Sequence, residues 1–300
     1  MPQLIDGNAV AQKIKDEAAA KTAALKERGC EPCLAVILVG DDPASRVYVN
    51  NKKKDCAQVG IKSAEYVLPD DISQEELLAL IKKLNADESV HGILCQLPLP
   101  RHLDEKLVLN SISESKDVDA FHPINAGRLM LGEPVFLPCT PAGIIELLKA
   151  YNIDIAGKEC VILGRSSIVG KPMALLMLRH DATVTVCHSK TKNLTEVCRR
   201  ADILISAIGR ARFVTEYMVK EGAVVIDVGI NRDENGKICG DVDFQNVFPL
   251  VSYITPVPGG VGPMTRAILM KNTLTAALIQ KKIFEIFDYR LDIKHERKEK

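Results

Sequence analysis

The stretch Glu159–Pro172, ECVILGRSSIVGKP, decides the fold, because it joins an apolar strand to a helix through a turn that contains glycine. Glu159–Gly164 is a short apolar run that ends in glycine, which is typical of a buried strand. Val169–His180 is a predicted helix with Pro172 in its first turn, where a missing N–H costs little. Such a turn lets the backbone approach a pyrophosphate, and the helix N-terminus supplies N–H donors. The stretch therefore predicts a nucleotide site.

The turn departs from the GxGxxG pattern of dinucleotide-binding folds in two places. Ser166 stands where the second glycine would be, and Gly170 comes one residue late. From this pattern alone, an ordinary strand–helix turn that contains glycines is an equally good interpretation.

The following strand favours the nucleotide interpretation and indicates which nucleotide is bound. Enzymes that use NAD usually end this strand in Asp or Glu, which holds the ribose hydroxyls. Here Ala182–Cys187 is followed by His188, Ser189 and Lys190, with no acid. A carboxylate would repel a 2′-phosphate, whereas hydroxyl and cationic groups attract it. Together with Arg165 in the first turn, these residues predict NADP; for Arg165 alone, the alternative is a solvated loop side chain.

Strand and helix patterns alternate on both sides of this stretch. The predicted strands are Cys33–Gly40, Ala64–Leu68, His91–Pro98, Ala182–Cys187, Asp202–Ala207 and Ala223–Gly229. The predicted helices are Gly7–Arg28, Ser45–Val59, Ser73–Leu84, Ala142–Tyr151 and a long final one, Gly262–Phe287. Repeated strand–helix units imply a parallel sheet with right-handed crossovers, so the chain is predicted to be an α/β protein.

The length and one break in the pattern predict two domains. A chain of 300 residues fits one large α/β domain or two ordinary ones, and Phe136–Pro141 interrupts the alternation. We expect a first domain of residues 1–139, with a C-terminal helix in 264–300 packing back on it, and a second domain of residues 140–263. The charged tail Arg290–Lys300 is predicted to be a solvated, frayed end.

The composition excludes several classes of partner. Lys and Arg number 39, as do Asp and Glu, so no net charge attracts nucleic acid or an anionic membrane. The sequence has no apolar run long enough for a spanning helix, and Met1–Lys15 has no leader pattern, so a cytoplasmic location is expected. The 9 cysteines are scattered and Cys30–Cys33 is an isolated CxxC pair, which predicts reduced thiols and no metal site.

A few polar residues and one loop are candidates for chemistry. Tyr48 and Lys52 share a helix face, which places a ring that stacks on heterocycles beside a proton carrier; the alternative is an ordinary solvated helix. Gln96 ends a predicted strand, where parallel sheets face their binding crevice. Asp119 lies in a segment with no helical or strand period, and an exposed acid is the alternative there. The rigid loop Thr255–Thr265 allows close approach of the backbone to a ligand.

In their order along the chain, these motifs resemble those of the bifunctional methylenetetrahydrofolate dehydrogenase/methenyltetrahydrofolate cyclohydrolase family, called FolD in bacteria. The resemblance runs from Leu4 to about Leu278. It is carried by Tyr48–Lys52, Val90–Pro100, Lys116–Asp119, Pro138–Pro141, Gly164–Pro172, Cys187–Thr191, Asp227–Asn231 and Pro256–Thr265. Short-chain dehydrogenases also contain YxxxK, but there it follows the glycine-rich turn, whereas here it precedes that turn.

The resemblance implies two α/β domains with a cleft between them, the second a Rossmann-like NADP-binding domain through which the protein forms homodimers. It implies that Lys52 is the catalytic lysine, that Tyr48 is its partner over the folate ring, that Gln96 hydrogen-bonds and tunes the lysine, and that Asp119 anchors the pterin. Further folate-binding residues would be Leu97, Pro98, Pro258, Gly259 and Gly260. NADP-binding residues would be Gly164, Arg165, Ser166, His188, Ser189 and Ile230.

The implied activity is oxidation of 5,10-methylenetetrahydrofolate by NADP⁺, then hydrolysis of the methenyl product to 10-formyltetrahydrofolate, in one-carbon metabolism. Oxidation needs orientation more than acid–base power, because two nitrogens of the cationic product stabilise it. Hydrolysis needs proton transfer, which we expect of Lys52 with its pKa lowered by partial burial or a nearby cation. The alternatives are a dehydrogenase without cyclohydrolase activity and a folate- or nucleotide-binding protein without turnover.

One position departs from the family pattern. Ala120 stands where the family usually has glycine after the pterin-binding acid. If the position needs a positive φ, alanine costs about 1 kcal/mol there and shifts Asp119 slightly.

Overall fold

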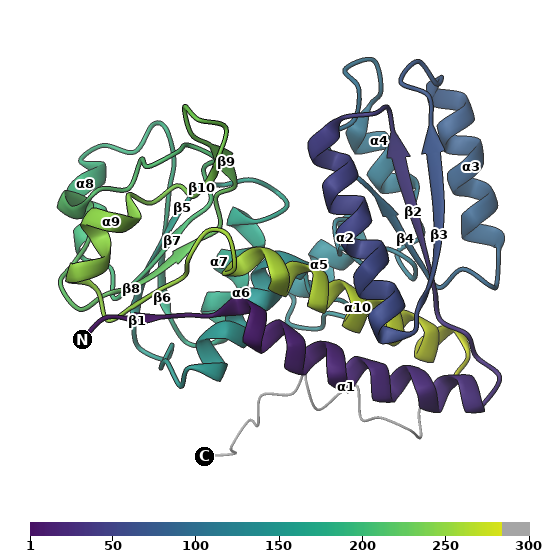
Figure 1. The fold of residues 1–300 in the computed structure, drawn as a ribbon, viewed down its shortest axis with the longest axis horizontal. Coiled ribbons are helices and arrows are strands. Elements are labelled where there is room, and N and C mark those ends of the chain that lie inside the picture. Colours follow the sequence, from purple (N-terminus) through teal and green to yellow (C-terminus); the bar gives the residue numbers. More distant parts are fainter. Residues whose placement is uncertain (284–300) are drawn as a thin grey trace. The chain divides into compact units, whose positions relative to one another are not determined.

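The computed structural model describes residues 1–283. They form two compact units, whose elements are labelled in Figure 1. Unit 1 comprises Met1–Lys13 and Pro138–Ile268, and unit 2 comprises Ile14–Leu137 and the described residues from Leu269 onward. Helices α1 (Gly7–Glu27) and α10 (Val261–Gln280) each contribute residues to both units.

Unit 1 is built on a six-stranded sheet in the order β1-β11-β8-β7-β5-β6. Every neighbouring pair is parallel, as predicted. The chain passes from β5 to β6 on one side and then returns to β7 on the other, so the strand order reverses at β5, and ligands bind outside the carboxyl ends of the strands at such a point. The strands are β1 (Gln3–Leu4), β5 (Glu159–Leu163), β6 (Thr183–Cys187), β7 (Ile203–Ser206), β8 (Val224–Asp227) and β11 (Tyr253–Ile254).

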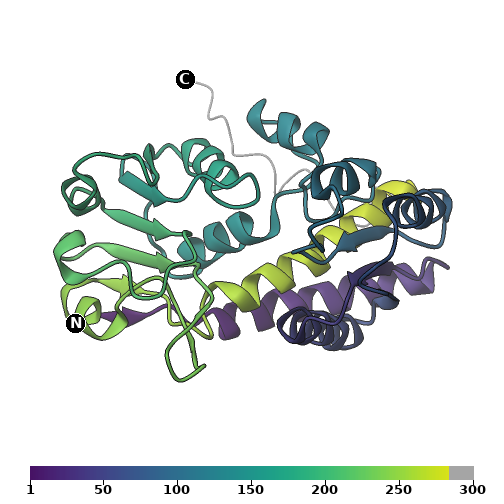
Figure 2. The ribbon, with the colours of Figure 1, turned by 90° about the horizontal axis from the view of Figure 1, so that it is seen from above.

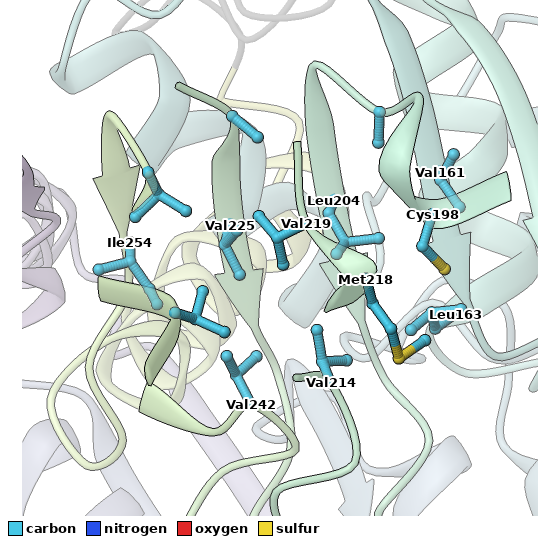
Figure 3. Close-up of a cluster of buried hydrophobic side chains, with 14 of the residues drawn as sticks. Val161, Leu163, Cys198, Leu204, Val214, Met218, Val219, Val225, Val242 and Ile254 are labelled. Carbon is cyan, nitrogen blue, oxygen red and sulfur yellow. The ribbon is translucent and has the colours of Figure 1, made fainter. Parts of the chain in front are cut away.

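A buried apolar cluster covers one face of this sheet (Figure 3). Val161 and Leu163 of β5 are two residues apart and therefore point to the same face, where they meet Cys198, Met218 and further side chains. Helices also pack on the other face, and the inner strands β5, β7 and β8 are nearly continuous apolar runs. The helices of unit 1 are α6 (Cys139–Ala150), α7 (Gly170–Arg179), α8 (Leu194–Arg199), α9 (Phe244–Val247) and the 3₁₀ turns η1 (Glu216–Met218) and η2 (Phe248–Leu250).

A short antiparallel hairpin, β9 (Asn231–Arg232) with β10 (Ile238–Cys239), follows β8. Figures 1 and 2 show it extending away from the body of unit 1.

Unit 2 has a three-stranded parallel sheet in the order β3-β2-β4. The central strand, CLAVILV, is buried along its whole length, as its unbroken apolar sequence predicts. Ser73 and Glu76 form the predicted capping box at the start of α3. The strands are β2 (Cys33–Val39), β3 (Lys62–Leu68) and β4 (Gly92–Cys95), and the helices are α2 (Pro43–Val59), α3 (Gln74–Ala86), α4 (Glu105–Ser111) and α5 (Pro123–Met130).

The units differ from the predicted domains 1–139 and 140–263 at three places, of which the break after Leu137 in place of residue 139 is a small shift. Residues 1–13 lie with unit 1, because Gln3 and Leu4 pair with β11. The last break falls between Ile268 and Leu269 rather than between residues 263 and 264, and both positions lie inside α10. The predicted helix Gly262–Phe287 corresponds to α10 as far as Gln280, while its last residues and the charged tail lie outside the described residues. Within residues 1–283, no helix has both the length and the hydropathy needed to cross a membrane.

Candidate functional site

In unit 2, α2 and the end of β4 bring Lys52 and Gln96 together. The Lys52 ammonium donates a hydrogen bond to Gln96 Oε1 at 2.9 Å, and both side chains are half-buried. Gln96 is fixed from both ends: its backbone N–H donates to Ile37 O at 2.8 Å, and its side-chain amide donates to Leu97 O at 2.7 Å. The acceptor oxygen is therefore held toward the lysine, which limits the positions that the ammonium can occupy.

Helix α2 is placed firmly by its ends. Asp42 caps it by accepting from the backbone N–H of Ser45 at 2.7 Å, Pro43 occupies the first turn, and Gly60 closes it with a φ of 81°. Tyr48 lies one turn before Lys52 and is half-buried. The two side chains therefore share a helix face, as their spacing predicts.

The two thiols near Lys52 are neutral. Burial raises the pKa of Cys56 to about 12 and that of Cys95 to about 12, although the Lys52 cation acts on both in the opposite direction. Neutral thiols are poor nucleophiles, so these cysteines pack as small apolar side chains. The chemistry available here is proton transfer by the lysine.

A buried acid that the sequence interpretation did not single out, Asp117, orders the segment that carries Asp119. It accepts hydrogen bonds from the backbone N–H groups of Phe121 at 3.2 Å and His122 at 2.8 Å, and from Asn125 Nδ2 at 2.9 Å. Burial raises the pKa of Asp117. Asp119 itself is half-buried. The motif KDVD places this acid two residues before Asp119 but does not show which backbone N–H groups it accepts from.

Ala120 has a φ of 60°, which is the left-handed conformation that the glycine of the family would favour. We expect Ala120→Gly to raise the free energy of unfolding by about 1 kcal/mol, because glycine removes the steric cost. Urea unfolding of the variant and the parent measures this. Ala20→Gly, at an exposed position of α1, is the control with the opposite sign and should lose about 1 kcal/mol. An Ala120→Gly protein less stable than the parent would contradict the assigned strain.

In unit 1, the turn after β5 requires glycine at both ends. Gly164 has a φ of 111°, and a Cβ there would lie 2.3 Å from the carbonyl oxygen of Ala207. A Cβ at Gly170 would lie 2.2 Å from the carbonyl oxygen of Gly164. Ser166 fills the place of the missing glycine and accepts hydrogen bonds from the backbone N–H groups of Val169 at 3.1 Å and Gly170 at 3.3 Å. The turn is therefore closed at the start of α7, at the reversal point of the sheet.

The turn after β6 is preorganised and carries no carboxylate. The His188 backbone N–H donates to Thr191 Oγ1 at 2.9 Å, and His188 Nδ1 accepts from the Lys190 N–H at 3.2 Å. This turn adjoins the first one, because the Gly164 N–H donates to Cys187 O at 2.9 Å. Arg165 and Ser189 are exposed on the two adjoining turns. Cationic and hydroxyl groups without an acid fit the extra phosphate of NADP.

The remaining predicted residues of unit 1 lie on loops that follow β8 and β11. Ile230 is 50% exposed just after β8. The loop of Pro258, Gly259 and Gly260 follows β11 and is held by Gly7, whose N–H donates to Gly259 O at 2.9 Å. A Cβ on Gly7 would lie 1.8 Å from Gly260 O. Only glycine at this position, the first residue of α1, lets the loop pack here. Within the described residues, no cluster of three or more His, Cys, Asp or Glu side chains could hold a metal ion.

The reversal point at β5, its glycine turn and the acid-free turn after β6 define unit 1 as a Rossmann-like dinucleotide-binding domain, in an α/β protein with a second α/β unit. Two family models match the chain: the tetrahydrofolate dehydrogenase/cyclohydrolase catalytic domain at residues 5–119, and the NAD(P)-binding domain of the same family at residues 138–281. The chain belongs to the tetrahydrofolate dehydrogenase/cyclohydrolase family, which confirms the predicted resemblance.

Relatives of known name or structure cover nearly the whole chain. The bifunctional protein FolD of Acetivibrio thermocellus is 59% identical over 281 residues, which is 94% of this chain and 99% of that protein. The crystal structure of the bifunctional FolD enzyme of Campylobacter jejuni superposes with a TM-score of 0.91 at 58% identity, covering 92% of this chain and 99% of that one. The Trypanosoma brucei enzyme, solved with NADP and an inhibitor, gives 0.89 at 40% identity and covers 95% and 99%.

Proposed function

We propose that this protein is a bifunctional enzyme that oxidises 5,10-methylenetetrahydrofolate with NADP⁺ and hydrolyses the 5,10-methenyl product to 10-formyltetrahydrofolate. Both family models and the FolD relatives support the two activities. The observation that carries the proposal is the 2.9 Å hydrogen bond from Lys52 to Gln96, since a dehydrogenase alone has no need of a positioned proton carrier.

In the oxidation step, the residues of the chain bind the nucleotide and the folate and orient them. When bound, NADP⁺ supplies the hydride acceptor, and the residues that would hold it are Gly164, Arg165, Ser166, His188, Ser189 and Ile230. Tyr48 offers a flat ring to stack on the folate heterocycle, and the Asp119 carboxylate accepts hydrogen bonds from the pterin. The oxidised carbon forms an amidinium that its two nitrogens stabilise, so no acid or base is needed here.

The hydrolysis step requires a residue of the chain to transfer a proton. A water oxygen bonds to the methenyl carbon, and the product carries its formyl group on N10, so the bond from this carbon to N5 must break. In the neutral form, Lys52 takes the proton that the water loses and then returns it to N5. Gln96 accepts from Lys52 and thereby aims the amine.

Two absorbance assays test the function. Formation of NADPH from 5,10-methylenetetrahydrofolate measures the oxidation, and loss of methenyltetrahydrofolate absorbance without nucleotide measures the hydrolysis. We expect both, with NADP⁺ strongly preferred over NAD⁺. Oxidation without hydrolysis would indicate a monofunctional dehydrogenase, and the absence of both would indicate a binding protein.

Arg165 and Ser189 are expected to set the nucleotide preference. Arg165→Ala should raise the KM for NADP⁺ at least tenfold and leave the KM for NAD⁺ unchanged, because a charge-assisted contact to the 2′-phosphate is lost. Ser189→Asp should add repulsion and shift the preference further toward NAD⁺. Steady-state kinetics with each nucleotide measures both effects. Lys192→Ala removes an exposed charge just beyond the turn after β6 and serves as the control. Equal losses with both nucleotides would refute the assignment to the phosphate.

We further propose that the protein is a homodimer formed through unit 1, supported by the exposed edge strand β6. This strand, TVTVC, ends the sheet and carries no charge or proline, the usual protections of a free edge. Val186 of the strand is 36% exposed and Leu178 of α7 is 53% exposed. Sedimentation should show a dimer that Val186→Lys dissociates. Leu131→Lys, at an apolar side chain of unit 2 that is 79% exposed, should not. A dimer that survives Val186→Lys unchanged would exclude this edge.

A cytoplasmic location is also proposed. It is supported by the 9 cysteines, all of which are free, since unpaired thiols are usual in reducing compartments. A disulfide in protein isolated from its host without reductant would contradict it.

A further inference from the structure

Two buried acids, Asp227 and Asp241, lie at the carboxyl edge of the sheet in unit 1, and neither belongs to the predicted site. Asp241 is 0% exposed and Asp227 is 4% exposed. Burying a carboxylate is costly unless hydrogen bonds compensate it, so their partners show what holds them there.

The Asp241 carboxylate accepts five hydrogen bonds from uncharged donors. They are Ser206 Oγ at 3.1 Å, the backbone N–H groups of Ile208 at 2.8 Å, Gly209 at 3.3 Å and Arg210 at 2.8 Å, and Asn231 Nδ2 at 2.9 Å. Three of these donors are consecutive backbone groups of the loop that follows β7. The carboxylate therefore determines the path of the loop Ala207–Arg210.

That loop forms one wall of the Gly164 turn. The Ala207 N–H donates to Leu163 O at 2.8 Å, which continues the pairing of β7 with β5. The Ala207 carbonyl oxygen lies 2.3 Å from the place where a Cβ on Gly164 would stand. A displacement of the loop would therefore change the backbone position at the turn proposed to receive the pyrophosphate.

Asp227 holds Asp241 in place. Its carboxylate accepts from the backbone N–H groups of Gly229, Asp241 and Val242, each at 2.9 Å. Burial raises the pKa of Asp227 to about 7, with the nearby Asp241 charge acting in the same direction. Near neutral pH a fraction of Asp227 is protonated, which reduces repulsion between the two acids.

We propose that Asp241 is a positioning residue for the oxidation step: it holds the loop Ala207–Arg210 against the Gly164 turn and so sets the affinity for NADP⁺. The proposal rests on the proposed function, because it deepens the assignment of the nucleotide site. Asp241 is fully buried and acts through the loop, not through contact with the nucleotide. Hydrolysis uses no nucleotide, and its proton transfer depends on Lys52 and Gln96 of unit 2, so it should be insensitive to Asp241.

Asp241→Asn tests this, because it keeps the size of the side chain but turns an NH₂ group toward the loop donors, which leaves buried N–H groups unpaired. We expect the Kd for NADP⁺, measured by titration calorimetry, and the KM for NADP⁺ to rise at least tenfold, while kcat and KM for hydrolysis stay within about twofold of the parent. Asp243→Asn is the matched control: this carboxylate accepts from Asn246 Nδ2 and makes none of the loop contacts, so no value should change.

An unchanged Kd for NADP⁺ in folded Asp241→Asn would overturn the proposal. If that variant does not fold, Ser206→Ala is the test, since it removes one of the five donors to Asp241. It should weaken NADP⁺ binding about threefold and keep hydrolysis. An unchanged Kd for NADP⁺ in Ser206→Ala would also refute the proposal. A parent protein that binds NADP⁺ without oxidising folate would refute the proposed function and still allow both titrations. A parent that binds no NADP⁺ would refute both.

Discussion

Lys52→Met is expected to lower the cyclohydrolase rate by about two to four orders of magnitude, which is the usual contribution of a positioned acid–base group, and to leave NADP⁺ binding unchanged. Methionine is about as long as the lysine stem but cannot carry a proton or donate to Gln96. Loss of methenyltetrahydrofolate absorbance measures the hydrolysis, and titration calorimetry measures the nucleotide. The Kd for NADP⁺ should stay the same because the nucleotide residues belong to unit 1, whereas Lys52 belongs to unit 2.

The neighbouring residue provides the control. Lys53 is exposed and pairs with Glu65 of β3 at 2.9 Å, so its ammonium points away from Gln96. Lys53→Met removes the same charge from the same helix and should keep cyclohydrolase activity. Retained hydrolysis in purified, folded Lys52→Met would refute the role of Lys52, and equal losses in both variants would indicate that only the general charge of α2 matters.

The sequence predicted the elements with strong local patterns and missed those defined by distant partners. The apolar runs at β2, β5 and β7 carry their own signal, because a strand buried on both faces is apolar at every position. By contrast, β1 and β11 have two residues each and exist because they pair across most of the chain. Periodicity has no meaning over two residues, so the sequence could not show that Gln3 and Leu4 join the sheet of unit 1.

The same distinction applies to the candidate site. The sequence predicts Tyr48 and Lys52 as site residues by their spacing on a helix. It predicts Gly164 by its place in a turn between a strand and a helix. Asp117 and Asp241 could not be predicted, because each acts by accepting backbone N–H groups that only the folded loop brings together. A sequence shows which side chains can touch a ligand more readily than which side chains hold the loops that do.

Gly164→Ala should have the opposite selectivity to Lys52→Met. A methyl group there would lie 2.3 Å from Ala207 O, and the φ of 111° is one that alanine rarely adopts. The turn after β5 must therefore move, and a backbone that binds pyrophosphate through N–H groups loses its alignment. We expect the kcat/KM of the dehydrogenase for NADP⁺ to fall at least about 100-fold, by analogy with the loss of preorganised backbone donors at other anion sites. Hydrolysis of methenyltetrahydrofolate should remain near the parent rate.

Gly157→Ala is the control that separates backbone strain from a steric clash with a neighbouring atom. Gly157 also has a positive φ, 73°, but a Cβ there would meet no atom within 4 Å. This variant should lose about 1 kcal/mol of stability and keep its affinity for NADP⁺, because alanine in this conformation is strained without displacing a neighbour. If Gly164→Ala binds NADP⁺ as the parent does, the turn is not the pyrophosphate site. If Gly157→Ala weakens NADP⁺ binding as much as Gly164→Ala does, the loss reflects destabilisation of unit 1 and not the geometry of the turn.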